Sequence, residues 1–505
     1  MTRKQLTETC KTTAGKGRDF LSRFASNTRG NVAMIFGVSL LPIMISVGVA
    51  VDLSRSLAVR ERLSQAIDAA ALAAGASPGM TTAAKTTYVN DYLIANYDTT
   101  QIGTLGSLSI SEVADVVTVS ATATMNTVFL GIIGYSNLTL NVSTQVTRNT
   151  SGLEFVMVLD NTGSMSGSKI DDLKTAANKL VDVLYGAPGS TSPLKIGLVP
   201  FSAAVNIGTA ARAEGWMDEF GDAALAKSKM NYTPGQTVWD LYDAIPNRAW
   251  NGCVEARQQP YDTTDDPSVS ADTLFQPYFA PDENSASGYA NNYLVDGITG
   301  TTQVRQKYVG KYNGTSVSSG SRGPLRGCTV DPVTRLTNDK ATITNAINAM
   351  GASGYTHIPV GLVWGWRLIS PDAPFTEGVA YTDATWKKAL VILTDGENTI
   401  NSTSNDNKSN YSAYGHLVDG RLGTTSASAF KDQLNNNTSL LCKRIKAEGI
   451  RVYSITFSVS SSTVTKLMKG CASEPGLYFN SPTGTELTAA FEAIAQDLNN
   501  LRISK

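Results

Sequence analysis

The stretch Leu153–Ser166, LEFVMVLDNTGSMS, decides how the rest of this 505-residue sequence is interpreted. It opens with a short apolar run that ends at Leu159, and turn residues follow at once from Asp160. A short apolar run bounded by turn residues predicts a buried strand. A helical pattern begins at about Lys169, and open α/β sheets bind their ligands where a strand leads through a turn into a helix.

Asp160, Thr162 and Ser164 alternate along this turn. They offer one carboxylate and two hydroxyls, and hard cations such as Mg²⁺ prefer oxygen ligands of this kind. The sequence Asp-Asn-Thr-Gly is also an ordinary turn or helix cap, so the turn alone is weak evidence for a metal.

Composition excludes some classes of function. The net charge of −1 argues against a nucleic-acid-binding protein. Only two histidines are present and no CxxC occurs, which argues against a zinc site. We find no GxSxG, Walker or HExxH motif, so no catalytic residues are predicted and we expect no enzyme.

An uncharged run at Val32–Val51 follows a basic leader at residues 1–30. Twenty residues at about 1.5 Å each span a bilayer core of about 30 Å. The basic flank predicts a cytoplasmic leader, with the bulk of the chain on the far side of the membrane. We therefore expect a single-pass membrane protein. The alternative is a cleaved signal peptide, for which both the apolar run and the leader are long.

Four of the five cysteines follow this run, and Cys10 precedes it. An even number on one side of a membrane indicates disulfides in an oxidising compartment. Proximity in sequence favours the pairs Cys253–Cys328 and Cys442–Cys471. Four buried free thiols are the alternative.

A helical extension of the membrane segment is predicted to end near residue 76, followed by a small α+β module at 77–150. The extension could pack on a partner helix or on the next domain of its own chain. In the module we expect a helix at Thr82–Asn96 and strands at Leu108–Val113, Val116–Ala123 and Leu138–Thr147. The module contains no candidate catalytic or metal-binding residues, so we expect it to be a spacer or an assembly surface.

Residues 31–76 resemble the N-terminal segment of the TadG-type proteins of Tad (tight adherence) or Flp pilus assembly. The resemblance rests on the RGN start, the apolar span, the VD-S-R exit and the DAAALAA run. Prepilin processing after Gly30 would need Glu where Ile35 stands, so we expect a retained anchor. The resemblance implies a role in pilus biogenesis, adhesion or attachment. It also implies an anchor in a bacterial inner membrane, with the bulk of the chain periplasmic or at the cell surface.

From Leu153 onward, strand and helix patterns alternate, which predicts an α/β fold with a doubly wound, mainly parallel sheet. One predicted strand, Lys388–Leu393, runs into Thr394 and Asp395. Residues 151–505 resemble a von Willebrand factor A domain. That family holds a divalent ion on three loops, through a DxSxS motif, a Thr and an Asp. The resemblance implies as metal ligands Asp160, Thr162, Ser164, Thr356 and Asp395.

Two departures from the family pattern are mild: Thr162 replaces a Ser and keeps the hydroxyl, and Tyr355 replaces a common Gly. The site also makes sense physically. Strands ending at Leu159 and Leu393 would bring Asp160 and Asp395 to one sheet edge, where two carboxylates repel unless a cation or proton joins them. Mg²⁺ is the expected ion, with Mn²⁺ or Ca²⁺ as alternatives, and it could accept a carboxylate from a protein ligand. Glu397 and Asn398 beyond it are expected to be solvated loop residues.

An A domain needs about 200 residues, so two insertions are predicted. The first, at about 209–335, holds Cys253 and Cys328 and is expected to form a disulfide-clamped subdomain. The second, at about 398–428, is expected to rim the metal edge. A disordered surface loop is the alternative.

Three functions compete. The first is membrane-anchored, metal-dependent binding of pilus or envelope components. The second is a metal-independent envelope scaffold that associates with copies of itself or with pilins. The third is an A-domain subunit that partners an ATPase or chelatase, against which the membrane segment and disulfides speak.

Overall fold

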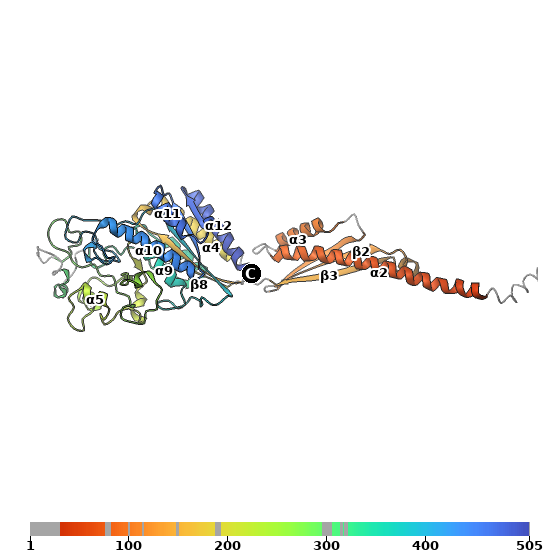
Figure 1. Ribbon diagram of the computed structural model, residues 1–505, viewed down its shortest axis with the longest axis horizontal. Helices are drawn as coiled ribbons and strands as arrows, with labels where there is room; N and C mark the ends of the chain where they lie inside the picture. Colours follow the sequence, from red (N-terminus) through yellow and green to blue (C-terminus); the bar gives the residue numbers. More distant parts are fainter. Residues whose placement is uncertain are drawn as a thin grey trace, which may run out of the picture. The chain divides into compact units, whose positions relative to one another are not determined.

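The computed structural model describes residues 31–75, 82–98, 102–113, 116–147, 151–186, 193–294, 306–313, 317 and 322–503. The basic leader and Cys10 lie outside these residues. The chain divides into two compact units, Met1–Arg148 and Asn149–Lys505, which we call the N-terminal and C-terminal units (Figure 1).

The N-terminal unit packs two helices on one face of a three-stranded antiparallel sheet. Its elements are α2 (Asn31–Gly75), α3 (Thr82–Asn96), β1 (Thr104–Val113), β2 (Val116–Asn126), a short 3₁₀ turn η2 (Leu130–Ile133) and β3 (Asn137–Thr147), with strand order β1-β2-β3. Side chains of β2 alternate between buried and half-buried, as a one-sided sheet requires. The Ala-rich part of α2, including Ala66, Ala70 and Ala74, is buried against this sheet.

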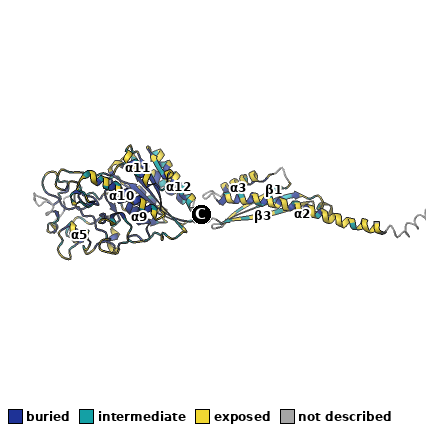
Figure 2. Ribbon diagram, viewed as in Figure 1, coloured by how far each residue is buried: buried dark blue, intermediate teal, exposed yellow. Residues whose placement is uncertain are grey.

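The first half of α2 has a different environment. Large apolar side chains from Val32 to Val51 are exposed, whereas Val59 and Leu63 farther along are buried (Figure 2). The helix is long and apolar enough to cross a membrane. The second half of α2 therefore packs on the sheet of its own unit, whereas the apolar side chains of the first half are exposed.

The C-terminal unit is built on a six-stranded sheet of order β11-β10-β9-β4-β5-β8. All neighbouring strands are parallel except β5 and β8. This confirms the predicted mixed α/β fold with a mainly parallel sheet. The strands are β4 (Gly152–Asp160), β5 (Leu194–Phe201), β8 (Thr334–Thr337), β9 (Trp386–Thr394), β10 (Arg451–Phe457) and β11 (Tyr478–Ser481).

Helices cover both faces of this sheet, and the central strand β4 is therefore buried on both sides. Leu153, Phe155 and Met157 face a core shared with α4 (Ser168–Tyr185), α8 (Lys340–Ala349) and α12 (Gly484–Ile503). Val156 and Val158 face a second core shared with α9 (Ile358–Ile369), α10 (Ala427–Ala447) and α11 (Ser462–Cys471). A strand with two buried faces reads as the continuous apolar run seen in the sequence.

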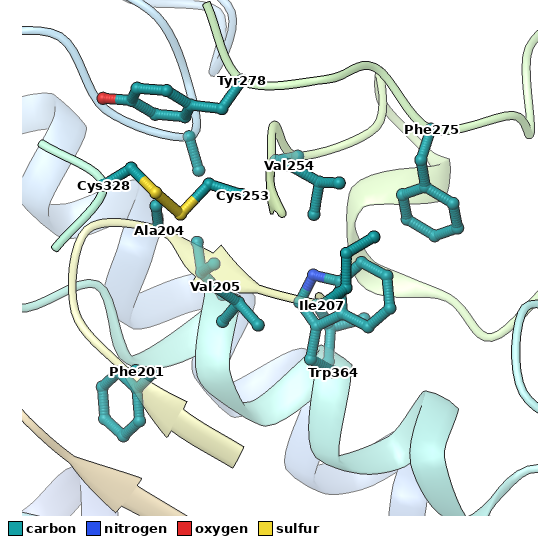
Figure 3. Close-up of a cluster of buried hydrophobic side chains, with 14 of the residues drawn as sticks. Phe201, Ala204, Val205, Ile207, Cys253, Val254, Phe275, Tyr278, Cys328 and Trp364 are labelled. Atoms are coloured by element: carbon teal, nitrogen blue, oxygen red, sulfur yellow. A yellow bond between two sulfur atoms is a disulfide. The ribbon is translucent and has the colours of Figure 1, made fainter. Parts of the chain in front are cut away.

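The first insertion forms an outer layer over α9. It contains the short elements α5 (Ala224–Lys229), α6 (Val238–Ala244) and β7 (Cys253–Val254), and β7 pairs with β6 (Val205–Asn206), which lies just before the insertion. Phe275 packs against Trp364 of α9 with ring centroids 4.7 Å apart (Figure 3). Every residue of α9 is buried as a result. The insertion thus shares one core with the sheet, where we had expected a subdomain of its own.

Both predicted disulfides are confirmed. Cys253–Cys328 closes the first insertion with a sequence separation of 75, and Cys442–Cys471 ties α10 to the end of α11 with a separation of 29. Figure 3 shows the first bridge among buried apolar side chains.

We expect the longer bridge to matter more for stability. By loop-closure entropy it contributes about 4 to 5 kcal/mol and the shorter one about 3 to 4 kcal/mol. Replacing Cys253 and Cys328 together by Ala should therefore lower the thermal midpoint more than replacing Cys442 and Cys471. Thermal unfolding under oxidising conditions measures both, with Cys10→Ala as the control. A larger loss for the shorter bridge would contradict this ranking.

Candidate metal centre

Asp160 and Asp395 meet at one edge of the sheet because their strands end side by side. β4 ends at Asp160, and β9 ends at Thr394, one residue before Asp395. The two strands are parallel, with Leu159 opposite Leu393. Both carboxyl side chains are completely buried.

Two hydroxyl groups link these carboxylates. Thr162 donates from its backbone nitrogen and from Oγ1 to Asp160 Oδ1, at 2.9 and 2.6 Å. Ser164 Oγ lies 3.0 Å from Thr162 Oγ1 and donates to Asp395 Oδ1 at 2.6 Å. The alternating residues of the first loop therefore form one continuous chain of oxygen atoms from Asp160 to Asp395.

Thr356 lies in a segment that is held against this loop by backbone hydrogen bonds. Gly163 donates to the carbonyl of Gly354 at 3.0 Å, and Ser353 donates to the carbonyl of Asn161 at 2.7 Å. Gly354 has a φ of 90°, and a Cβ there would stand 3.1 Å from the Ser202 side chain, so glycine is required. Thr356 itself is buried. All three predicted loops thus come together at the strand ends.

The second insertion borders the same segment. The amide of Thr356 donates to Thr399 Oγ1 at 2.9 Å. Asn398, expected in solvent, is instead buried, and its Oδ1 accepts from the amide of Ile358 at the start of α9. Our interpretation of Asn398 was therefore wrong: an amide side chain after the third loop satisfies a free helix N–H. Glu397 is exposed, as expected.

Burial gives Asp160 an unusual proton affinity. Desolvation and the nearby charge of Asp395 raise its pKa to about 6, although hydrogen bonds from Thr162 and Thr394 act in the opposite direction. Thr394 Oγ1 donates to Asp160 Oδ2 at 2.7 Å. Two carboxylates in one dry site repel each other, so the site favours a bound cation or proton.

Lys169 supplies one positive charge to this site. Its Nζ donates to Asp395 Oδ2 at 2.7 Å, and its side chain is 30% exposed while that of Asp395 is fully buried. Sequence reasoning missed both Lys169 and Thr394. A signal existed for Lys169, because a cation in the first turn of a helix opposes the helix dipole and needs a nearby anion.

The donor set fits a hard divalent cation. Two carboxylates and the hydroxyls of Thr162 and Ser164 are grouped, with Thr356 on the adjoining segment, and Mg²⁺ binds oxygen ligands of this kind. Ser164 is exposed, so the centre opens to solvent. Among the described residues no group of three or more His, Cys, Asp or Glu forms a metal cluster, and two carboxylates with hydroxyls fall below that count.

Residues 30–77 match the family model described as "Putative Flp pilus-assembly TadE/G-like". This N-terminal segment is TadE/G-like. The match confirms the resemblance found in the sequence, and it covers α2 alone among the helices and strands. No curated protein matches the chain significantly.

Three solved structures are among those to which this chain is similar. The vWF domain of the type V pili tip protein Mfa5 from Porphyromonas gingivalis shares 12% identity at a TM-score of 0.34, over 70% of this chain and 97% of that chain. The pilus adhesin SpaC from Lactobacillus rhamnosus GG shares 12% at 0.33, over 80% and 37%. The proximal thread matrix protein 1 from the mussel byssus, with a zinc-occupied MIDAS motif, shares 11% at 0.29, over 70% and 47%.

The chain spans less than half the length of the last two proteins. These TM-scores are too low to transfer a metal, a ligand or a function from any of the three proteins.

The raised pKa of Asp160 predicts a pH-dependent penalty in metal-free protein. The folded state holds this proton more tightly than the unfolded state, so stability falls as pH rises from about 4 to about 6 and stays low above that. The size is on the order of 3 kcal/mol at most. Asp160→Asn should therefore gain in thermal midpoint over wild type as pH rises from 4 to 7 in EDTA. The exposed variant Asp171→Asn serves as control, and a constant gap for Asp160→Asn would contradict the assignment.

In metal-free protein Lys169 should stabilise the buried carboxylate of Asp395. The same positive charge should weaken the binding of a metal ion at this site. In EDTA, Lys169→Met is expected to unfold at a lower temperature than wild type, because Asp395 loses its partner. Added Mg²⁺ should then raise the midpoint of this variant more than that of wild type. Lys174→Met on the same helix is the control. Equal Mg²⁺ responses in Lys169→Met and wild type would show that Lys169 does not compete.

Proposed function

We propose that this protein is a membrane-anchored, metal-dependent protein-binding component of a Tad/Flp-type pilus system. The observation that carries the proposal is the oxygen chain from Asp160 through Thr162 and Ser164 to Asp395, at the open edge of a buried sheet. The TadE/G-like segment at residues 30–77 supports the pilus-related setting.

We infer that the C-terminal unit is a doubly wound von Willebrand factor A-like domain. The mainly parallel sheet, the helices on both of its faces and the convergence of three loops at the strand ends support this fold. The two insertions enlarge it on the side of α9 and α10. They pack on each other through the amide of Ala256, which donates to the carbonyl of Ala413.

In the proposed centre Asp160 and Asp395 neutralise the ion, and Thr162, Ser164 and Thr356 add oxygen ligands without charge. A bound Mg²⁺, or Mn²⁺ or Ca²⁺ in its place, supplies an electrophilic position for a carboxylate of a protein ligand. This is a binding role, and we propose no enzymatic activity.

The proposed location is a bacterial inner membrane, with the C-terminal unit on its outer side. The exposed apolar first half of α2 supports a single-pass anchor, and the basic residues that precede it favour a cytoplasmic N-terminus. Pilus or envelope proteins would then be within reach of the metal centre, as would further copies of this chain.

A metal-independent envelope scaffold remains the second candidate. The ion pair between Lys169 and Asp395 favours it, because this lysine supplies in part the positive charge that a metal would bring.

Mg²⁺ dependence separates the two functions. Full-length protein in detergent and EDTA should gain in thermal midpoint on adding Mg²⁺, since a ligand at 100 times its Kd stabilises by about 2.7 kcal/mol. Asp160→Ala and Asp395→Ala should lose this gain, whereas Asp171→Ala on α4 should keep it. Crosslinked capture of pilus or envelope components should follow the same pattern. Capture that survives both EDTA and the two alanine variants would refute the metal-dependent function and favour the scaffold.

A further inference from the structure

The connection between β2 and β3 carries an unusual set of exposed apolar side chains. We call residues 127–136, TVFLGIIGYS, the apolar loop; it contains no charged residue. Its largest exposures are Ile132 at 77%, Tyr135 at 65% and Val128 at 57%, and Ile133 and Phe129 are also exposed. A soluble hairpin end is normally polar, so a contiguous apolar tip of this kind indicates a contact surface.

The apolar loop is held beside Asp52, just after the end of the apolar run of α2. The carboxylate of Asp52 is buried and accepts the backbone N–H groups of Val128, Phe129 and Leu130 at 2.8 to 3.0 Å. Hydrogen bonds to a carboxylate are strong, and three of them on one side chain hold the loop firmly. The loop closes on itself through the amide of Thr127, which donates to the carbonyl of Ser136.

A contact at Gly48 shows where along α2 the loop lies. A Cβ on Gly48 would stand 2.6 Å from the Phe129 side chain, so the ring lies directly on the helix backbone. Gly48 is one turn before the end of the apolar run at Val51, and the run begins at Val32. At about 1.5 Å per residue, the ring therefore touches α2 about 5 Å inside the end of a span of about 30 Å.

We propose that the apolar loop inserts into the outer interfacial region of the lipid bilayer that the first half of α2 crosses. This inference rests on the proposed membrane anchoring of α2. Lipid is the occupant that fits, because the loop and the first half of α2 both expose large apolar side chains, and Phe129 of the loop packs on Gly48 within the apolar run of α2. Tyr135 adds an aromatic ring with a polar end, which bilayer interfaces favour. The N-terminal unit would thus contact the bilayer at two places, the first half of α2 and the apolar loop.

A polarity-sensitive fluorophore on single cysteines tests this inference. Full-length Cys10→Ser protein, with both disulfides intact, is labelled after Ile132→Cys and placed in phosphatidylcholine–phosphatidylglycerol vesicles. Half of the samples carry lipids with a nitroxide near the head-group end of the acyl chain. We expect a blue-shifted emission and at least a twofold loss of intensity with nitroxide lipid.

Two matched positions provide the controls. Val38→Cys in the anchor should be quenched from within the bilayer. Ser111→Cys is exposed and pairs opposite Thr118, eight residues from the loop end of β2, so its label lies about 27 Å away along the strand and should remain unquenched.

Each outcome decides the matter. Quenching at Ile132 and Val38 but not at Ser111 supports insertion of the loop. Quenching at Val38 alone overturns the inference while leaving the anchor in place. A blue shift at Ile132 without quenching means that protein covers the loop, a second copy or another chain, and also overturns it. No quenching at any position overturns the membrane anchoring and this inference with it.

Discussion

Electrostatic repulsion between Asp160 and Asp395 is the constraint on which the C-terminal unit depends. Both side chains are buried at the ends of adjacent parallel strands, where water cannot separate their charges. Each surrounding group reduces this repulsion in its own way: Thr162 and Thr394 donate to Asp160, Ser164 donates to Asp395, and Lys169 brings a full positive charge. The residues around the strand ends are therefore arranged to accept positive charge.

The first insertion covers the outer side of α9, the helix that follows the second loop of the site. In a doubly wound domain of ordinary size the outer side of α9 would face solvent. Here Trp364 packs on Phe275, and Arg367 is buried, donating to the carbonyls of Tyr261 and Thr264 in the first insertion. A buried guanidinium is tolerated only when its N–H groups find partners, and the backbone of the insertion provides them. The helix that follows Thr356 is thus clamped between two layers.

Sequence patterns predicted the parts that depend on local signals. The apolar run before Asp160 identified a strand buried on both faces, and the strand before Asp395 had to end at the same edge if the sheet was parallel. Tertiary partners could not be predicted in the same way. In the sequence Lys169 only marked the start of a helical pattern, and Asn398 was expected to be a solvated loop residue. Their roles could not be predicted, because they depend on groups more than 35 residues away in the chain. The packing of the first insertion over α9 was also hidden, since its aromatic residues show no regular period.

The N-terminal unit has a mechanical consequence. β3 runs from the apolar loop, near Asp52, to the opposite end of the unit, where a Cβ on Gly75 would stand 2.9 Å from Val146. A pull on the chain beyond Thr147, resisted by the anchored start of α2, would therefore load β3 along its length against β2. The 11 residues of β3 would then share the tension at once, instead of separating one pair at a time as when a hairpin is unzipped. The pairing of β3 with β2 therefore resists such a pull in shear.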